Sequence, residues 1–123
     1  MTRINKYHLS ATLDASGDAT EYTKPTRGKV LAVQIKRPTN SCTVDLDTED
    51  ELKSQKIADI SSGTSDLVLY PRTPSQDHEG TDVTFDGSNE IYEPFVVDGR
   101  IKLSVAGGTQ DDEVEVSIIM EEF

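Results

Sequence analysis

The stretch that decides the fold is PFVVDGRIKLSVAGGTQDDEVEVSIIM, residues 94–120. Apolar and polar residues alternate in it twice, first around Leu103 and then from Val114 to Met120. A period of two predicts two half-buried β-strands, each with one apolar and one polar face. The link between them, AGGTQDD, is rich in turn-forming residues, so we expect one long β-hairpin. Neither strand holds a catalytic pattern, so this part of the chain indicates a scaffold or a binding surface.

Shorter strands separated by turns are expected along the rest of the chain. They lie at residues 6–13, 19–23, 29–36, 42–47, 67–70 and 91–97, with brief pairing at 82–85. In the strand at 29–36, Leu31, Val33 and Ile35 are expected to share one face. Pro94 indicates an edge strand or a bulge. The dipeptide Asp98-Gly99 indicates a second hairpin turn.

Two segments are less regular. Residues 53–60 fit either one or two helical turns or a short edge strand, and strand or irregular structure is favoured. Residues 61–66 are rich in Ser and Gly and indicate a loop. The whole pattern gives about eight short strands and little or no helix. We therefore predict an all-β fold, an antiparallel β-sandwich or jelly-roll-like arrangement, in a single domain over residues 1–123.

The charge of the chain is strongly negative. It has 123 residues with a formal net charge of −11, and acids gather at residues 45–51 and 111–122. Such a surface repels nucleic-acid phosphates and anionic lipid, so neither nucleic acid nor a membrane is an expected partner. It favours a basic protein partner, although acidic runs are also typical of a solvated face or a salt-rich habitat.

No segment predicts insertion into a membrane or export. No run approaches the roughly 20 apolar residues of a membrane span, and residues 1–14 lack the apolar centre of a signal peptide. The only cysteine is Cys42, so no intrachain disulfide can form. These features predict synthesis in a reducing cytoplasm.

The single cysteine is not expected to be a nucleophile. Cys42 alternates with Val44 and Leu46, which predicts a small core residue. A nucleophilic thiol needs a histidine partner, and neither His8 nor His78 lies in a recognisable catalytic motif. With no other catalytic motif present, we predict that the chain is not an enzyme.

The acidic run at residues 45–51 is only superficially similar to a calcium loop. Counted from Asp45, the sixth position of an EF-hand loop falls on Asp50 instead of glycine, and the twelfth falls on Lys56 instead of glutamate. We therefore predict no metal, cofactor-binding or catalytic residues. A cation shared by the alternating aspartates stays open as an alternative to a solvated face.

Two groups of residues are candidates for a protein interface. The first is Tyr70-Pro71-Arg72, which ends a strand with an aromatic ring, a rigid turn and a planar cation. The second comprises four cations near strand entries: Arg27, Lys29, Arg100 and Lys102. For the first group the alternative is that Tyr70 caps the edge of the core and Arg72 pairs with an acid. For the second group the alternative is that the cations neutralise neighbouring acids.

The order of several short motifs resembles that of a known protein group. The motifs are Arg-Gly-Lys before an apolar strand at 27–35, Tyr-Pro-Arg at 70–72, PFVVDGRIK at 94–102 and VAGG at 105–108. In this order they resemble short virion proteins of tailed bacteriophages that are encoded among head and structural genes. The resemblance covers most of the chain, from about residue 9 to residue 119.

The resemblance implies a β-sandwich virion protein without catalysis. It implies a capsid decoration or cement protein that binds the major capsid protein on the head exterior as a homo-oligomer, for example a trimer. Alternatives are a head–tail connector or a tail-associated protein. A carbohydrate-binding module is less favoured, because the chain has no Trp and only four Tyr to stack on sugar rings.

Overall fold

The computed structural model describes residues 3–123 as eleven β-strands, and it has no helix in that range. The strands are β1 (Arg3–Thr12), β2 (Ala19–Tyr22), β3 (Thr26–Lys36), β4 (Cys42–Thr48), β5 (Lys56–Gly63), β6 (Leu67–Leu69), β7 (Thr73–Pro74), β8 (Tyr92–Glu93), β9 (Val96–Gly99), β10 (Ile101–Ala106) and β11 (Glu113–Glu122). The all-β prediction is confirmed, with more strands than the eight expected.

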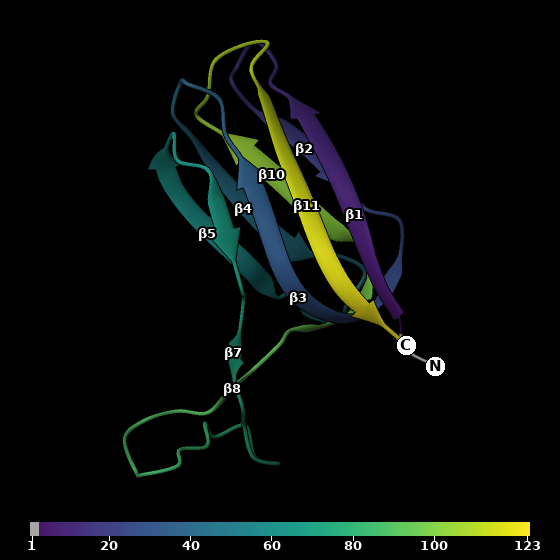
Figure 1. The fold of residues 1–123 in the computed structure, drawn as a ribbon, viewed down its shortest axis with the longest axis vertical. Helices are drawn as coiled ribbons and strands as arrows, with labels where there is room; N and C mark the ends of the chain where they lie inside the picture. The colour runs from purple at the N-terminus through teal and green to yellow at the C-terminus, as the bar shows by residue number, and fades with distance from the viewer. Residues whose placement is uncertain (1–2) are drawn as a thin grey trace.

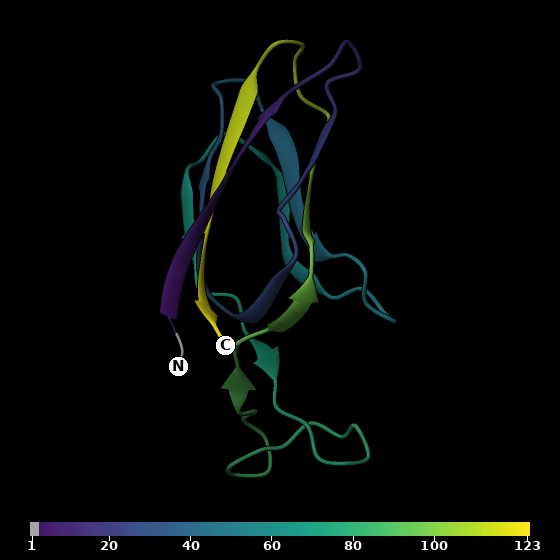
Figure 2. The same cartoon turned by 90° about the vertical axis from the view of Figure 1, so that its right-hand side faces the viewer.

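Two antiparallel sheets face each other across one core (Figures 1 and 2). Sheet A has the order β1-β11-β3-β6, and β9 also pairs with β3; sheet B has the order β2-β10-β4-β5. The apolar faces of the two sheets meet inside. Val114, Val116, Ile118 and Met120 of β11 are fully buried there, as are Ile101 and Leu103 of β10. Burial of this core between two sheets is the main favourable term in folding.

The predicted hairpin of residues 101–120 is wrong. Strand β10 pairs with β2 and β4 in sheet B, whereas β11 pairs with β1 and β3 in sheet A. Residues 107–112 therefore form an arch that crosses from one sheet to the other. The reason is that both strands bury their apolar faces in the same core from opposite sides. For the same reason Asp98-Gly99 is not a hairpin turn, because β9 belongs to sheet A and β10 to sheet B.

The arch at residues 107–112 packs on a second arch, the β1-β2 link at residues 13–18, at the same end of the sandwich. The amide of Gly108 donates to the carbonyl of Gly17 at 3.0 Å, and the amide of Asp111 donates to the carbonyl of Leu13 at 3.0 Å. The links at residues 37–41 and 64–66 lie at this end too, which we call the arch end (Figure 1). Arg37 ties them together, since its guanidinium donates to the carbonyls of Ser65 at 2.8 Å, Ser61 at 2.9 Å and Cys42 at 3.1 Å.

Three local predictions are corrected. The register of β3 against β11 shifts at Leu31, so Val30, Val33 and Ile35 are buried and Leu31 is only half-buried. Residues 61–63 belong to β5 instead of a loop, while the strand preference for residues 53–60 is confirmed from Lys56 onward. Residues 91–97 do not form one strand, because the chain breaks at Pro94 between β8 and β9.

A long excursion leaves the opposite end of the sandwich. Residues 70–95, which we call the arm, contain the two-stranded ribbon β7-β8 and two isolated bridges, Gln76 with Asp82 and Thr84 with Glu90. Both bridges confirm the brief pairing predicted at 82–85, through Asp82 and Thr84. The arm projects away from the sandwich at the end where both chain termini lie, which we call the arm end (Figures 1 and 2).

Candidate functional site

Most of the predicted interface cations neutralise acids of the same molecule. Arg100 Nε lies 2.9 Å from a carboxylate oxygen of Asp50, and its guanidinium stacks over the Tyr22 ring at 4.6 Å. This hydrogen-bonded pairing lowers the pKa of Asp50. Lys102 Nζ lies 3.9 Å from Glu49.

The cations on sheet A behave differently from each other. Arg27 Nε lies 3.3 Å from a carboxylate oxygen of Asp98 across the β3-β9 ladder. Lys29 has no ion pair among the described residues. Its side chain is therefore the one member of the predicted cation group that stays available to a partner.

The acidic run at residues 45–51 is organised around a lysine. Lys56 Nζ lies 3.3 Å from Asp47 and 3.8 Å from Asp45, across the β4-β5 ladder. Burial, and then the neighbouring carboxyl of Asp59, raise the pKa of Asp45. Residues 3–123 contain no group of three or more side chains placed to hold a metal ion. The ammonium of Lys56 takes the position between the alternating aspartates.

Tyr70-Pro71-Arg72 forms the first part of the arm. Tyr70 is 67% exposed, whereas Pro71 is buried. Arg72 folds back, and its Nη1 donates to the carbonyl of Pro71 at 2.8 Å. The aromatic ring is thus presented to solvent beside an anchored proline.

The arm exposes further large apolar side chains that sequence reasoning did not single out. Phe85 is 70% exposed, Tyr92 58% and Ile91 41%. No residue between 72 and 94 is buried, so the arm has no core of its own. Single apolar residues in a polar link gave no periodic signal, which is why the sequence did not reveal them.

Backbone hydrogen bonds and aspartate turns give the arm its shape. The amide of Ser75 donates to the carbonyl of Ile91 at 2.7 Å, and the amide of Val83 donates to the carbonyl of Ser75 at 2.8 Å. Asp86 accepts the amides of Asn89 and Ser88, and these hydrogen bonds lower its pKa. The exposed rings are therefore held on a defined backbone.

The outer face of sheet A, which we call the A face, carries a second set of exposed apolar side chains. The strand register places rows across it that include Ile4–Glu121–Lys29–Val96, Lys6–Ile119–Ala32, His8–Ser117–Gln34–Val68 and Ser10–Glu115–Lys36, and the pair Arg27–Asp98 lies on the same face. Ile4, Val68 and Val96 are each more than half exposed. The outer face of sheet B differs, because its rows Thr20–Ser104–Asp45–Asp59 and Tyr22–Lys102–Asp47–Lys56 are almost wholly polar.

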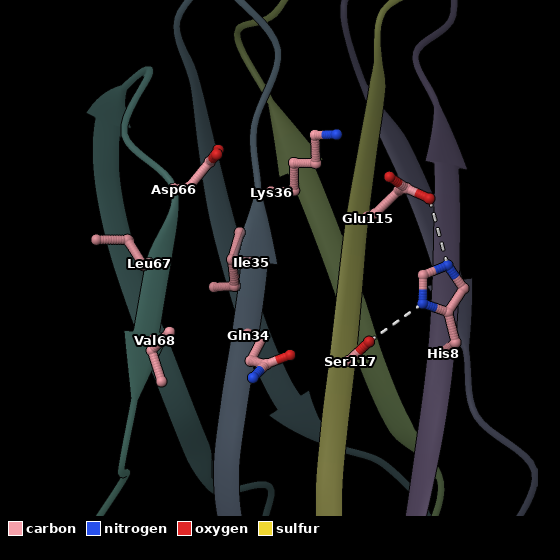
Figure 3. Close-up of a pocket in the computed structure, with 9 residues that line it drawn as sticks. All are labelled: His8, Gln34, Ile35, Lys36, Asp66, Leu67, Val68, Glu115 and Ser117. Atoms are coloured by element: carbon pink, nitrogen blue, oxygen red, sulfur yellow. Dashed lines mark hydrogen bonds and ion pairs between the residues drawn. The ribbon is translucent and has the colours of Figure 1, made fainter.

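The upper part of the A face is hollowed. A shallow depression of about 370 Å³ lies between β1 and β6, lined by side chains that include His8, Gln34, Lys36, Val68 and Ser117 (Figure 3). It is wide and open to solvent, and no Phe, Tyr or Trp lines it. This shape suits contact with a protruding protein segment better than enclosure of a small molecule.

A serine, a histidine and a carboxylate meet in this hollow (Figure 3). His8 Nδ1 lies 3.2 Å from Ser117 Oγ, and His8 Nε2 lies 3.5 Å from Glu115 Oε1. Acyl transfer would also need N–H donors for an oxyanion. Ser117 lies in the middle of β11, whose amides are engaged in ladders on both sides. The cluster is better explained as a polar part of the A face.

Cys42 lies in the core at the arch end. Its side chain is buried, and this burial raises the pKa of the thiol although Arg37 opposes the shift. The prediction of a small core residue is confirmed. A thiol of this kind is a poor nucleophile because little thiolate forms.

Comparison with known proteins adds only distant similarities. No protein-family model matches the sequence, and no curated protein matches it. The structure is similar to a chain from the virus-like particle of the extra small virus of the giant freshwater prawn Macrobrachium rosenbergii, with a TM-score of 0.35 and 8% identity over 98% of this chain and 78% of that chain. It is also similar to a chain from infectious bursal disease virus, Gx strain, with a TM-score of 0.34 and 9% identity over 98% of this chain and 41% of that chain. Both TM-scores are too low to carry an argument about function.

Within residues 3–123, no helix is long and apolar enough to cross a membrane.

Proposed function

We propose that this chain is a non-catalytic virion structural protein that decorates or cements a tailed-phage capsid. In this role it binds the major capsid protein on the head exterior, after synthesis in the host cytoplasm. The order of the motifs at 27–35, 70–72, 94–102 and 105–108 supports the virion assignment by resemblance. The structure supports the assembly role through its exposed surfaces.

The observation that carries the proposal is the uneven distribution of exposed large apolar side chains. Of the ten in residues 3–123, all but Val68 lie in the arm or at the arm end; these nine are Ile4, Tyr22, Leu52, Tyr70, Phe85, Ile91, Tyr92, Val96 and Phe123. Exposed apolar groups gathered on one part of a protein mark interaction surfaces. A protein that attaches to a lattice by one end is expected to have this polarity.

The links of the arch end are acidic and carry none of the exposed large apolar side chains. The links of the arch end carry six acids, Asp14, Asp18, Asp66, Asp111, Asp112 and, at the start of β11, Glu113. Arg37, the cation of these links, is buried, and Lys36 at the end of β3 is exposed. If the arch end points away from the capsid, its acidic side chains keep it hydrated and repel the arch ends of other particles.

Quantitative mass spectrometry of purified particles tests the proposal. A decoration protein is present in a copy number comparable to that of the major capsid protein. A head–tail connector or a tail-associated protein, which is the alternative, is present in a few copies per particle. Absence of the chain from particles that contain the capsid protein would refute the virion assignment.

A further inference from the structure

We infer that the arm of one copy of this chain docks on the A face of a second copy. This inference rests on the proposed assembly function and deepens it, because it names the surface through which copies contact each other. The arm side chains Phe85, Ile91 and Tyr92 then serve the contact between copies. The side chains that stay exposed at the arm end for the capsid are Tyr22, Leu52, Tyr70 and Phe123.

The A face has the composition of a partly apolar interface and not of a solvated sheet. Ile4, Val68 and Val96 are exposed on it, beside the half-buried Ile119. The outer face of sheet B, by contrast, consists of polar rows in which Lys56 pairs with Asp45 and Asp47, as is typical of a solvent-exposed sheet. We therefore expect a partner to cover the exposed apolar side chains of the A face.

The A face is also less acidic than the rest of the molecule. Its strands carry the cations Lys6, Arg27, Lys29 and Lys36 against the acids Asp98, Glu113, Glu115 and Glu121, and three of the cations, Lys6, Lys29 and Lys36, have no ion pair among residues 3–123. Equal numbers of cations and anions make this face close to neutral on a chain whose net charge is −11, and its three unpaired lysines are available to an anionic segment. An anionic partner segment is favoured there over a cationic one.

The arm has the complementary chemistry. It contains six acids, at positions 77, 79, 82, 86, 90 and 93, and Arg72 is its only lysine or arginine. Its exposed side chains Phe85, Ile91 and Tyr92 supply apolar and aromatic area of the kind that dominates interface energetics. Phe95 packs against the sandwich core and Pro71 is buried, so both ends of the arm are anchored while its middle is free.

The width of the A face and the direction of the arm together mean that the arm of one copy contacts the A face of another copy. Four strands about 4.8 Å apart make a face roughly 15 Å wide, which is enough to seat a two-stranded ribbon with its side chains. The arm points away from its own sandwich and cannot lie on its own A face (Figures 1 and 2). The contact is therefore heterologous, arm to face, and repeats into a closed ring or an open chain. A three-membered ring is the closed form that agrees with a trimer.

Two variants separate the two halves of the contact. In the armless variant, a short Gly-Ser linker replaces residues 72–94; the strand pairing of Thr73 with Glu93 shows that the two cut ends lie side by side. In the face variant, Val68→Glu places a charge on the edge strand β6 of the A face, in the lining of the hollow, at a side chain that is 56% exposed. Thr20→Glu, which adds the same charge to the exposed outer face of sheet B, is the matched control. Thermal melting confirms that each variant is folded.

Sedimentation velocity of the purified full chain and the variants tests the inference. The wild type and Thr20→Glu are expected to form oligomers, which weaken as salt is added. Each of the other two variants alone is expected to be monomeric. Their mixture is expected to form a 1:1 dimer, because the armless copy keeps its face and the Val68→Glu copy keeps its arm.

Three results would overturn the inference: a monomeric wild type, a variant that still forms wild-type oligomers, or a mixture that gives no 1:1 dimer. None of these results bears on whether the chain is found in particles. The particle composition tests the proposed function separately.

Discussion

Replacement of Gly17 by alanine tests whether the arches at residues 13–18 and 107–112 are stacked. Gly17 has φ +78°, a conformation that costs an L-residue about 1–2 kcal/mol. A Cβ atom on Gly17 would also lie 2.1 Å from the carbonyl oxygen of Gly108, so the backbone of the second arch would have to move. Overpacking of this kind costs about 1–3 kcal/mol. We therefore expect Gly17→Ala to lower the free energy of unfolding by about 2–5 kcal/mol.

The matched control is Gly107→Ala, in the same pair of arches. Gly107 has φ +68°, but a Cβ there meets nothing within 4 Å. This variant should lose only the conformational term of about 1–2 kcal/mol. Urea denaturation of both variants measures the difference, which we expect to be about 1–3 kcal/mol. Equal losses in the two variants would refute arch stacking and would favour a β10-β11 hairpin, in which Gly17 has no such neighbour.

Three further predictions concern buried or charged groups. Arg37→Met leaves three carbonyls without their donor and should destabilise the protein by about 3 kcal/mol in urea denaturation, with partial recovery in Arg37→Lys; a loss below about 1 kcal/mol would contradict this role. Asp45→Asn should raise the melting temperature at pH 7, because the raised pKa of Asp45 means that its ionised form costs stability. That gain should shrink as the pH is lowered through the raised pKa of Asp45, because the wild-type carboxyl then becomes protonated, and a lower melting temperature at pH 7 would contradict the sign. The Cys42 thiol should react with a disulfide reagent only as fast as the protein unfolds, and rapid labelling in native buffer would show that it is accessible.

The sequence predicts strands well because alternation reports which side chains are buried. The inward faces of β4, β10 and β11 are as the period of two indicates. Alternation does not report which strands are paired, since a strand presents the same pattern in either sheet. The link AGGTQDD is compatible with a hairpin and also long enough to cross the roughly 10 Å between two packed sheets. Whether this link forms a hairpin or crosses between the sheets depends on which other strands pair with β10 and β11. The sequence pattern of the two strands alone does not contain that information, which is why the hairpin prediction fails.

The sequence identified candidate interface residues but did not show which of them pair within the molecule. Cations near strand entries were visible in the sequence, but their partners Asp50, Glu49 and Asp98 are set by tertiary structure. Tyr70-Pro71-Arg72 pointed to the base of the arm because Tyr and Arg carry a recognisable interface chemistry. Phe85 and Tyr92 were not found, because isolated exposed apolar residues leave no periodic pattern.

Cryo-electron microscopy of the particle tests most directly whether this chain assembles on a virion through its arm end. The predicted result is density for the sandwich on the outside of the head, with the arm end toward the major capsid protein and the arch end toward solvent. A head reconstruction from particles that contain the chain, with no such density on the exterior, would contradict the decoration role. Density with the arch end against the capsid would contradict the assignment of the arm end as the attachment surface.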